Sequence, residues 1–195
     1  MRIIRKSKDK VFVLIAIMLL LSTSIIYAQN KDNQSIEISF LYSKVSGFSS
    51  NQYAIWVENE NGEYVKTIYV TKFTATKGWK TRPEAIPVWV KKSNISKIGK
   101  KQVDLISGAT PKTGEQKYYW DFTDDNGKAV TDGKYTIVFE ATFDGNSKDP
   151  SEVQYKAIID KGKMIEILKN GAEYRGNSQR GKTMIDNVKY ELVKK

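Results

Sequence analysis

The sequence predicts an all-β domain folded as a sandwich of two antiparallel sheets. Three observations lead to this fold class. Short runs of residues alternate between apolar and polar side chains, which is the period of a strand with one buried face. Asn-Gly and Asp-Gly pairs, which favour tight turns, lie between several of these runs. No segment carries a long apolar stripe at helical spacing, so strands are expected to be the main element.

The first predicted strands follow one another closely along the chain. In residues 36–42 the predicted buried face consists of Ile36, Ile38, Phe40 and Tyr42, and in residues 53–58 it consists of Tyr53, Ile55 and Val57. Asn61-Gly62 then marks a tight turn, and residues 64–71 return as the second arm of a hairpin. On this returning strand, the residues expected to share one face are Val65, Thr67 and Tyr69.

Residues 134–143 form the clearest predicted strand, entered through the turn signals Asn126-Gly127 and Asp132-Gly133. Its apolar face consists of Tyr135, Ile137, Phe139, Ala141 and Phe143. The opposite face includes Thr136 and Thr142, which we expect to be exposed. Further strands are predicted at residues 87–91, 102–106, 117–122, 153–160, 164–168 and 188–193.

The N-terminal segment has the pattern of a secretory signal peptide. Five basic residues precede the apolar run 11–21, and a small residue, Ala28, offers a cleavage point before Gln29. We therefore predict a signal peptide at residues 1–28 and a single β-sandwich domain at residues 29–195, periplasmic or secreted after cleavage. An uncleaved membrane anchor is the alternative, because the apolar stretch can extend through Tyr27.

Composition limits the classes of function. The predicted mature segment carries 27 basic and 21 acidic residues, without the dense run of bases typical of a nucleic-acid-binding arm, so we expect no nucleic acid partner. The chain contains no His and no Cys. This excludes a Ser-His-Asp triad, a Cys nucleophile, a zinc site of the usual type, an iron–sulfur cluster and disulfides. The sequence offers no catalytic residue and no metal ligand set.

One stretch, Asp104-Leu105-Ile106-Ser107-Gly108-Ala109-Thr110-Pro111, points to chemistry. Gly108 and Ala109 have little bulk, and Pro111 biases Thr110 toward extended backbone, so the Thr110 hydroxyl is presentable to a partner. The alternative is an ordinary loop, since Gly, Pro, Ser and Thr are common wherever the chain turns.

The same stretch resembles the acceptor motif of bacterial flavin transferases. That motif has an acidic residue, two variable positions, Ser or Thr, Gly, Ala and a Thr that receives FMN through a phosphoester bond. The resemblance implies covalent FMN at Thr110, with Asp104, Ser107, Gly108 and Ala109 recognised by the transferase. One departure is Pro111, because the flavin carriers usually have a variable residue and then another Ser or Thr after the acceptor.

Two longer resemblances refine the fold. Trp120-Asp121 followed by Gly127, Gly133 and Tyr135 resembles a hairpin of the Ig-like module of flagellar hook-capping proteins, which implies an Ig-like sandwich. Four segments in order, listed here as residues 54–58, 64–74, 82–89 and 107–111, resemble an uncharacterised family of predicted periplasmic proteins. That resemblance spans about residues 36–159, and its members accompany flavin transferases and PepSY membrane proteins.

Three other features receive ordinary interpretations. The acidic run 121–127 is expected to form a turn, because its Gly is seventh and an EF-hand loop needs Gly sixth. Trp79, with its neighbours Lys77, Lys80 and Arg82, could form a cationic and aromatic rim near a flavin, but a solvated basic loop is the simpler interpretation. The remaining tryptophans, Trp56, Trp89 and Trp120, are expected in the core or half-buried in a sheet.

Two hypotheses for function follow. The leading one is a covalent FMN carrier in extracytoplasmic electron transfer, loaded by a flavin transferase and paired with a PepSY-type membrane redox protein. The alternative is a non-redox Ig-like structural or interaction module, in which the loop only connects elements. Under both hypotheses, we expect the protein to be a carrier or binding module and not an enzyme.

Overall fold

The computed structural model of the protein describes residues 34–44, 50–142, 152–160, 163–169 and 184–194. The chain divides into two compact units, Met1–Gln34 with Lys194–Lys195, and Ser35–Val193. The predicted signal peptide and its cleavage site lie outside the described residues.

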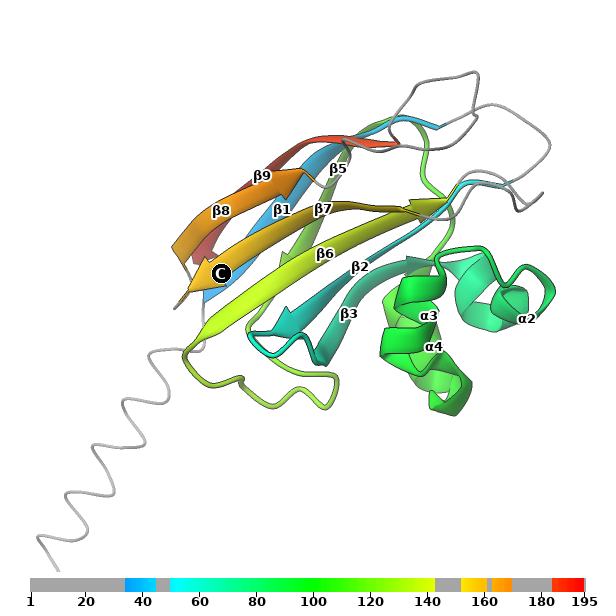
Figure 1. The fold of residues 1–195 in the computed structure, drawn as a ribbon, viewed down its shortest axis with the longest axis horizontal. Helices are drawn as coiled ribbons and strands as arrows, with labels where there is room; N and C mark the ends of the chain where they lie inside the picture. Colours follow the sequence, from blue (N-terminus) through cyan, green and yellow to red (C-terminus); the bar gives the residue numbers. More distant parts are fainter. Residues whose placement is uncertain (1–33, 45–49, 143–151, 161–162, 170–183, 195) are drawn as a thin grey trace, which may run out of the picture. The chain divides into compact units, whose positions relative to one another are not determined.

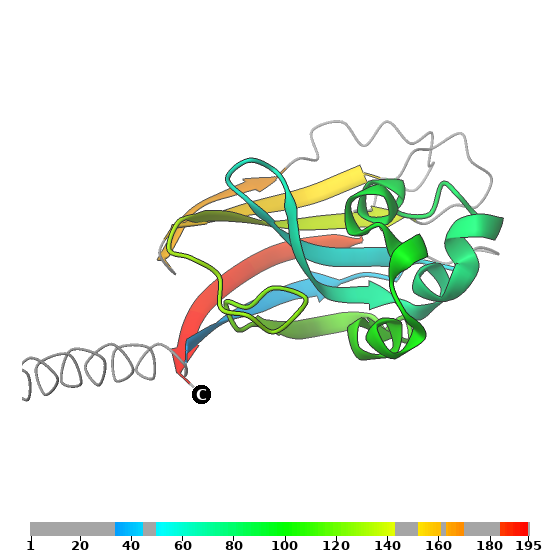
Figure 2. The same cartoon turned by 90° about the horizontal axis from the view of Figure 1, so that it is seen from below.

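The second unit is built on two sheets, which confirms the predicted β-sandwich (Figure 1). One sheet has the strand order β5 (Gly114–Trp120), β1 (Gln34–Tyr42), β9 (Ile185–Lys194), and Figure 2 shows β1 between its two neighbours. The larger sheet has the order β4 (Ser107–Gly108), β3 (Tyr64–Thr71), β2 (Gln52–Asn59), β6 (Lys134–Thr142), β7 (Glu152–Asp160), β8 (Lys163–Lys169). Neighbours in the larger sheet pair antiparallel except β3 and β4, which run parallel.

The main core lies between the two sheets, and alternate residues of β1, β2 and β6 form much of it. Its largest side chains include Ile38, Phe40, Tyr53, Ile55, Trp120, Ile137 and Phe139, all essentially inaccessible to solvent. The predicted apolar faces of residues 36–42, 53–58 and 134–142 are therefore correct, and Phe143, also assigned to this face, lies outside the described residues. The period of two in the sequence translates directly into this core because successive side chains of a strand point to opposite faces.

A layer of short helices covers the other face of the larger sheet and forms a second core. These helices are η1 (Thr74–Gly78), α2 (Trp79–Thr81), α3 (Pro87–Ser93), η2 (Ile95–Lys97) and α4 (Lys100–Ile106). They pack Trp89, Val103 and Ile106 against Trp56 of β2 and Val138 of β6. Strand β2 is thus buried on both faces, which its alternating sequence did not predict.

Two predicted strands are helices in the structure. Residues 87–91 belong to α3 and residues 102–106 belong to α4. The helical layer also covers Thr142, which is only 4% exposed and accepts a hydrogen bond from the backbone N–H of Ile86 at 3.3 Å. The prediction that Thr142 is exposed was wrong, because it assumed a sheet with one solvated face.

Helix α3 begins where a side chain from a distant strand accepts its free N–H groups. The carboxylate of Glu140 on β6 accepts hydrogen bonds from the backbone N–H groups of Val88 at 3.1 Å and Trp89 at 2.7 Å. A carboxylate at a helix N-terminus also interacts favourably with the helix dipole. Pro87 in the first turn has no N–H to satisfy, which suits it to this position. The residues that make this segment helical therefore lie about fifty positions away in sequence.

The spacing of the two buried residues of α4 is that of a helix. Val103 and Ile106 are three positions apart and pack into the second core, whereas Asp104 and Leu105 between them are exposed. That spacing places both apolar side chains on one helical face. In a strand, Val103 and Leu105 would share one face, whereas in the structure Val103 is buried and Leu105 is 73% exposed.

The hairpin of β2 and β3 is confirmed, but its faces are not regular. The turn is held by Asn59 Oδ1, which accepts the N–H groups of Asn61 at 3.0 Å and Glu63 at 2.9 Å. Register shifts interrupt the β2–β3 pairing, so Thr67 packs toward the helices while Tyr69 packs against the main core. The predicted sharing of one face by Val65, Thr67 and Tyr69 fails at Thr67, because each bulge adds a residue and shifts the alternation.

The segment that resembles hook-capping proteins connects the two sheets and contains a short hairpin turn, in which Thr123 pairs antiparallel with Ala129 and the Val130 N–H donates to the Phe122 carbonyl at 2.8 Å. Strand β5 belongs to the smaller sheet and β6 to the larger one, so the turn between them crosses the sandwich. Trp120 packs on Phe122 and Tyr135 at ring distances of 4.9 and 5.3 Å. Its indole N–H donates to the carbonyl of Thr123 at 3.0 Å. Trp120 thus holds the connection between β5 and β6 in place, and it is buried in the core as predicted.

Candidate functional site

The predicted acceptor stretch begins on a helix and ends in a loop at the edge of the larger sheet. Asp104 is exposed on α4, Ser107 and Gly108 form β4 beside Val70 and Thr71 of β3, and the chain then leaves the sheet. The structure keeps the five predicted site residues within one surface segment. It differs from the prediction in that a helix, and not a strand, leads into the motif.

Gly108 packs against an aromatic ring. A Cβ atom at this position would lie 2.8 Å from Cε2 and 3.1 Å from the hydroxyl of Tyr69. Separations below 3.0 Å require the neighbour to move. Tyr69 cannot move freely, because its ring is packed against two other tyrosines at ring-centroid distances of 4.7 and 5.1 Å. The lack of a side chain at Gly108 therefore has a packing reason within the protein itself.

Two hydrogen bonds fix the loop after Gly108. The hydroxyl of Tyr69 donates to the carbonyl of Ala109 at 2.8 Å, and the backbone N–H of Lys44 donates to Thr113 Oγ1 at 2.9 Å. Ala109 itself is exposed. The loop is thus held at both ends while its middle faces solvent, which is how a defined loop presents a side chain for recognition.

The Thr110 hydroxyl is partly buried and already bonded. Its Oγ1 donates to the backbone carbonyl of Asn51 at 3.2 Å. This distance is longer than the usual range for an O–H···O bond. Sequence analysis predicted a presentable hydroxyl but missed Asn51, because no local pattern links residues 59 positions apart.

The Ser107 hydroxyl, unlike that of Thr110, has no hydrogen-bond partner among the described residues. Its Oγ is buried. A buried hydroxyl without a partner costs free energy, so packing alone does not explain a Ser at this position.

A cluster of tyrosines lies beneath the loop. Tyr69 contacts Tyr53 and Tyr118, whose hydroxyls are 2.6 Å apart, and Tyr53 also packs on Tyr42 at a ring distance of 5.3 Å. Burial raises the pKa of all four phenols above its ordinary value, and the neighbouring phenols raise the pKa of Tyr53 further. The phenols therefore remain neutral at physiological pH. No sequence signal grouped these tyrosines, which come from four different strands.

The charged residues near the stretch are basic and exposed. Lys100 and Lys101 lie on the first turn of α4, and Lys112 follows Thr110 in the loop. Of the predicted basic rim, Arg82 is buried, and its Nη1 donates to the carbonyl and hydroxyl of Ser50 at 2.9 and 3.1 Å. Lys80 lies over the Trp79 ring at 5.0 Å. Arg82 therefore has a structural role, and it cannot belong to a cationic rim around a flavin.

The acidic turn has a structural role. Asp124 accepts the N–H groups of Asn126 and Lys128, both at 2.9 Å, and these bonds hold its pKa below the ordinary value. Asp125 accepts the Tyr64 hydroxyl at 2.8 Å, and burial raises its pKa. The two carboxylates serve different partners, which confirms the predicted turn.

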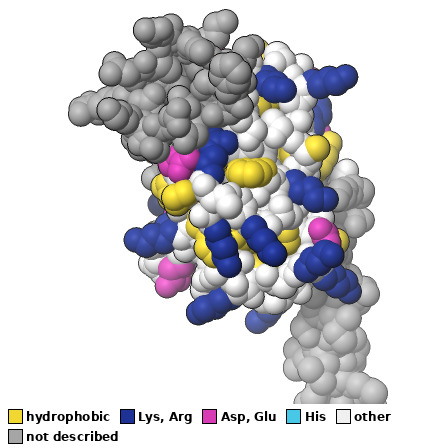
Figure 3. Space-filling model, turned by 90° about the vertical axis from the view of Figure 1, so that its right-hand side faces the viewer, with side chains coloured by type: hydrophobic (Ala, Val, Ile, Leu, Met, Phe, Trp, Pro, Cys, Tyr) yellow, Lys and Arg dark blue, Asp and Glu magenta, His cyan; other side chains and the backbone are white. Residues whose placement is uncertain are grey.

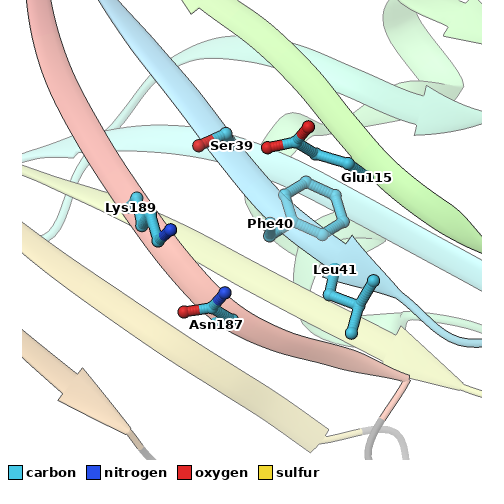
Figure 4. A pocket seen from close by; sticks show the side chains of 6 residues that line it. All are labelled: Ser39, Phe40, Leu41, Glu115, Asn187 and Lys189. Atoms are coloured by element: carbon cyan, nitrogen blue, oxygen red, sulfur yellow. The ribbon is translucent and has the colours of Figure 1, made fainter.

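A hollow on the smaller sheet offers little room for a ligand. Figure 4 shows it lined by Ser39, Phe40, Leu41, Glu115, Asn187 and Lys189, which come from β1, β5 and β9. Its volume is about 180 Å³, below the roughly 300–1,000 Å³ of typical small-molecule sites. We assign it no function.

These features define a β-sandwich protein that presents a hydroxyl-bearing loop. Within the described ranges, no group of three or more His, Cys, Asp or Glu side chains could hold a metal ion. The sequence matches, over residues 33–175, the model of a family described as predicted periplasmic protein (DUF2271), and the chain belongs to that family. The family description agrees with the periplasmic location that the N-terminal segment predicts.

Comparison with solved structures gives distant likenesses. Two crystal structures of truncated FlgD from the human pathogen Helicobacter pylori share 17% and 19% sequence identity with this chain, with TM-scores of 0.34 and 0.33. Both cover 73% of this chain, and the shares of their own chains are 87% and 86%. No curated protein matches the sequence. In the described part of the chain, no helix has the length and apolar character needed to cross a membrane.

Proposed function

We propose that this periplasmic protein carries FMN, covalently attached at Thr110, and takes part in extracytoplasmic electron transfer. The observation that supports this proposal is the surface display of the acceptor motif. Asp104 and Ala109 are exposed, Thr110 is partly exposed, and the loop between them is fixed by hydrogen bonds. A flavin transferase can therefore reach Asp104, Ala109 and Thr110, whereas the Ser107 hydroxyl is buried.

Attachment requires only a small local change. The Thr110 oxygen bonds to the flavin-bearing phosphorus of a flavin dinucleotide, the P–O–P anhydride bond breaks, the nucleoside monophosphate departs as the leaving group, and the hydroxyl proton passes to solvent. The ester oxygen can no longer donate to Asn51. Because that hydrogen bond is long and joins neutral groups, losing it costs about 0.5–1.5 kcal/mol. The fold tolerates such a loss, since the bond ties only the loop to β2.

The surroundings of Thr110 suit a flavin phosphate. Lys100, Lys101 and Lys112 are exposed cations close to it in sequence, and each would contribute on the order of 0.2–1 kcal/mol by offsetting the phosphate charge. The flavin would supply the redox chemistry, while the protein supplies orientation and electrostatics. The proposed partners are a flavin transferase, which loads the protein, and a membrane redox protein of the PepSY type.

The test is coexpression with a flavin transferase. Wild-type protein should keep yellow fluorescence after denaturation and carry the added mass of FMN on the peptide that contains Thr110. Thr110→Ala should abolish both signals, Asp104→Ala should reduce loading, and Ser107→Ala should have the smallest effect. A matched control is Ser96→Ala, which removes an exposed hydroxyl of the helical layer that takes no part in holding the acceptor loop.

The second candidate function is a non-redox structural or interaction module. The observation that favours it is that Gly108 is accounted for by its packing on Tyr69 and that the Thr110 hydroxyl already has a partner. If wild-type protein made with an active transferase carries no FMN mass at Thr110, the carrier proposal fails and the module remains.

A further inference from the structure

The basic residues of this protein are concentrated in one part of the chain. Residues 72–112, which form the helical layer and the acceptor loop, contain ten basic and two acidic residues. The rest of the predicted mature segment contains 17 basic and 19 acidic residues. The positive excess of the predicted mature segment therefore lies entirely within residues 72–112, and the rest of that segment has a net charge of −2.

The fold brings these cations to the surface of the helical layer. The exposed lysines of this segment, which we call the lysine face, are Lys72, Lys77, Lys80, Lys91, Lys97, Lys100, Lys101 and Lys112. Figure 3 views the molecule from the side on which α2, α3 and α4 lie in Figure 1, and dark-blue side chains are dispersed across it. The one arginine of the segment, Arg82, is buried and contributes nothing to this surface.

Most of these lysines have no acidic partner. Within the described part of the chain, no carboxylate lies within salt-bridge distance of Lys91, Lys97, Lys100 or Lys101. Lys92, by contrast, pairs with Glu58 at 3.1 Å. These four lysines are therefore free to interact with an anionic surface or partner.

Apolar side chains are exposed among the lysines. Phe73, Val88 and Leu105 are 44%, 36% and 73% exposed, and they are three of the six large apolar side chains exposed within the described ranges. Leu105 lies on the same short helix as Lys100 and Lys101. Exposed apolar residues interspersed with lysines are typical of surfaces that rest in the headgroup region of a bilayer.

We propose that the lysine face docks on an anionic phospholipid bilayer. Each lysine close to such a surface contributes about 1 kcal/mol, because it attracts the negative headgroups. Phe73, Val88 and Leu105 can then enter the boundary between headgroups and acyl chains. A lipid surface fits better than an acidic protein, since paired recognition of carboxylates favours arginine and the exposed cations here are lysines.

The experiment is co-sedimentation with vesicles. The protein is purified after export, its N-terminus is determined by intact mass, and it is mixed with vesicles of pure phosphatidylcholine or of phosphatidylcholine with 30% phosphatidylglycerol. The protein should bind the anionic vesicles in low salt, bind the neutral ones weakly, and be released by added salt. An apolar N-terminal anchor, if present, would instead bind both kinds of vesicle.

Matched variants separate the face from total charge. Lys91, Lys97, Lys100 and Lys101 are replaced together by Gln, and the control replaces the equally exposed Lys128, Lys134, Lys189 and Lys194. With about fivefold lost per lysine, the face variant should bind anionic vesicles at least about a hundredfold more weakly, and the control should stay close to wild type. Leu105→Gln should weaken binding without changing its dependence on salt.

Three outcomes would overturn the proposal. Equal binding to neutral and anionic vesicles would remove the electrostatic basis, and equal losses in both quadruple variants would show that total charge matters and the face does not. Failure to bind vesicles, together with salt-sensitive binding to polyglutamate, would point to an acidic protein partner. Repeating the measurement on Thr110→Ala, which cannot carry FMN, separates the failure of this proposal from the failure of the flavin proposal.

Discussion

At the residue scale, Gly108 and Tyr69 form a contact that decides the shape of the candidate site. The glycine leaves room for the Tyr69 ring, and the Tyr69 hydroxyl holds the next carbonyl of the loop. The position of Thr110 therefore depends on a side chain from β3, 41 positions earlier in the sequence. Loop geometry here is set by the sheet beneath it.

Gly108→Ala should destabilise the protein by about 1–3 kcal/mol, because the new methyl group overpacks against a ring that cannot move freely. The measurement is the free energy of unfolding in urea. Ala109→Ser is the control, since Ala109 is exposed and a small polar residue there should change stability by less than about 0.5 kcal/mol. Unchanged stability of Gly108→Ala would mean that Tyr69 does not press on this position.

At the element scale, the helical layer depends on the sheet that it covers. Helix α3 is only seven residues long, and isolated helices of that length do not form in water. Its first turn is bonded to Glu140, and its Trp89 indole N–H donates to Thr67 Oγ1 at 2.9 Å. The helix is thus stabilised by β6 at its start and by β3 along its buried face.

Glu140→Ala should cost about 3 kcal/mol of stability, because two N–H groups at the start of α3 lose their acceptor, one of them fully buried. Urea unfolding measures the loss, and hydrogen exchange at Val88 and Trp89 should accelerate. Glu115→Ala serves as the comparison, since this exposed glutamate lies on β5, outside the helical layer. A loss for Glu140→Ala no greater than that for Glu115→Ala would contradict the capping role.

At the scale of the whole molecule, the tyrosine cluster joins the two sheets. Tyr42 and Tyr118 come from the smaller sheet, Tyr53 and Tyr69 from the larger one, and their rings meet in the main core. Because burial raises the pKa of these phenols, the folded protein keeps their protons at a pH where the unfolded chain releases them. The stability they provide is fully present below pH 10, the ordinary tyrosine pKa, and is lost as the pH rises above it.

The protein should therefore unfold steeply in alkali, losing about 1.4 kcal/mol per buried tyrosine for each pH unit above 10. Urea unfolding at several pH values between 9 and 11.5 gives the slope, and ultraviolet difference absorption reports when the phenols ionise. The variant with Tyr53→Phe and Tyr118→Phe should lose stability less steeply with pH, because it lacks two of the phenols whose pKa is raised by burial. An identical slope in both proteins would show that these tyrosines ionise without unfolding.

The sequence by itself determined the strands of the sandwich and the turn at Asn61-Gly62. These features follow from the alternation of side chains and from the local chemistry of turn residues, which act over a few positions. The predicted acceptor motif was also identified from the sequence, because its residues lie within seven consecutive positions. These residues are Asp104, Ser107, Gly108, Ala109 and Thr110.

Only the tertiary structure decided which segments became helices and what the motif residues contact. Residues 87–91 have the composition of a strand, yet Glu140 accepts their N–H groups and a second core receives Trp89. Thr110 likewise bonds to Asn51, and Gly108 meets Tyr69. Local propensities differ by only fractions of a kcal/mol per residue, so caps and contacts from distant strands outweigh them.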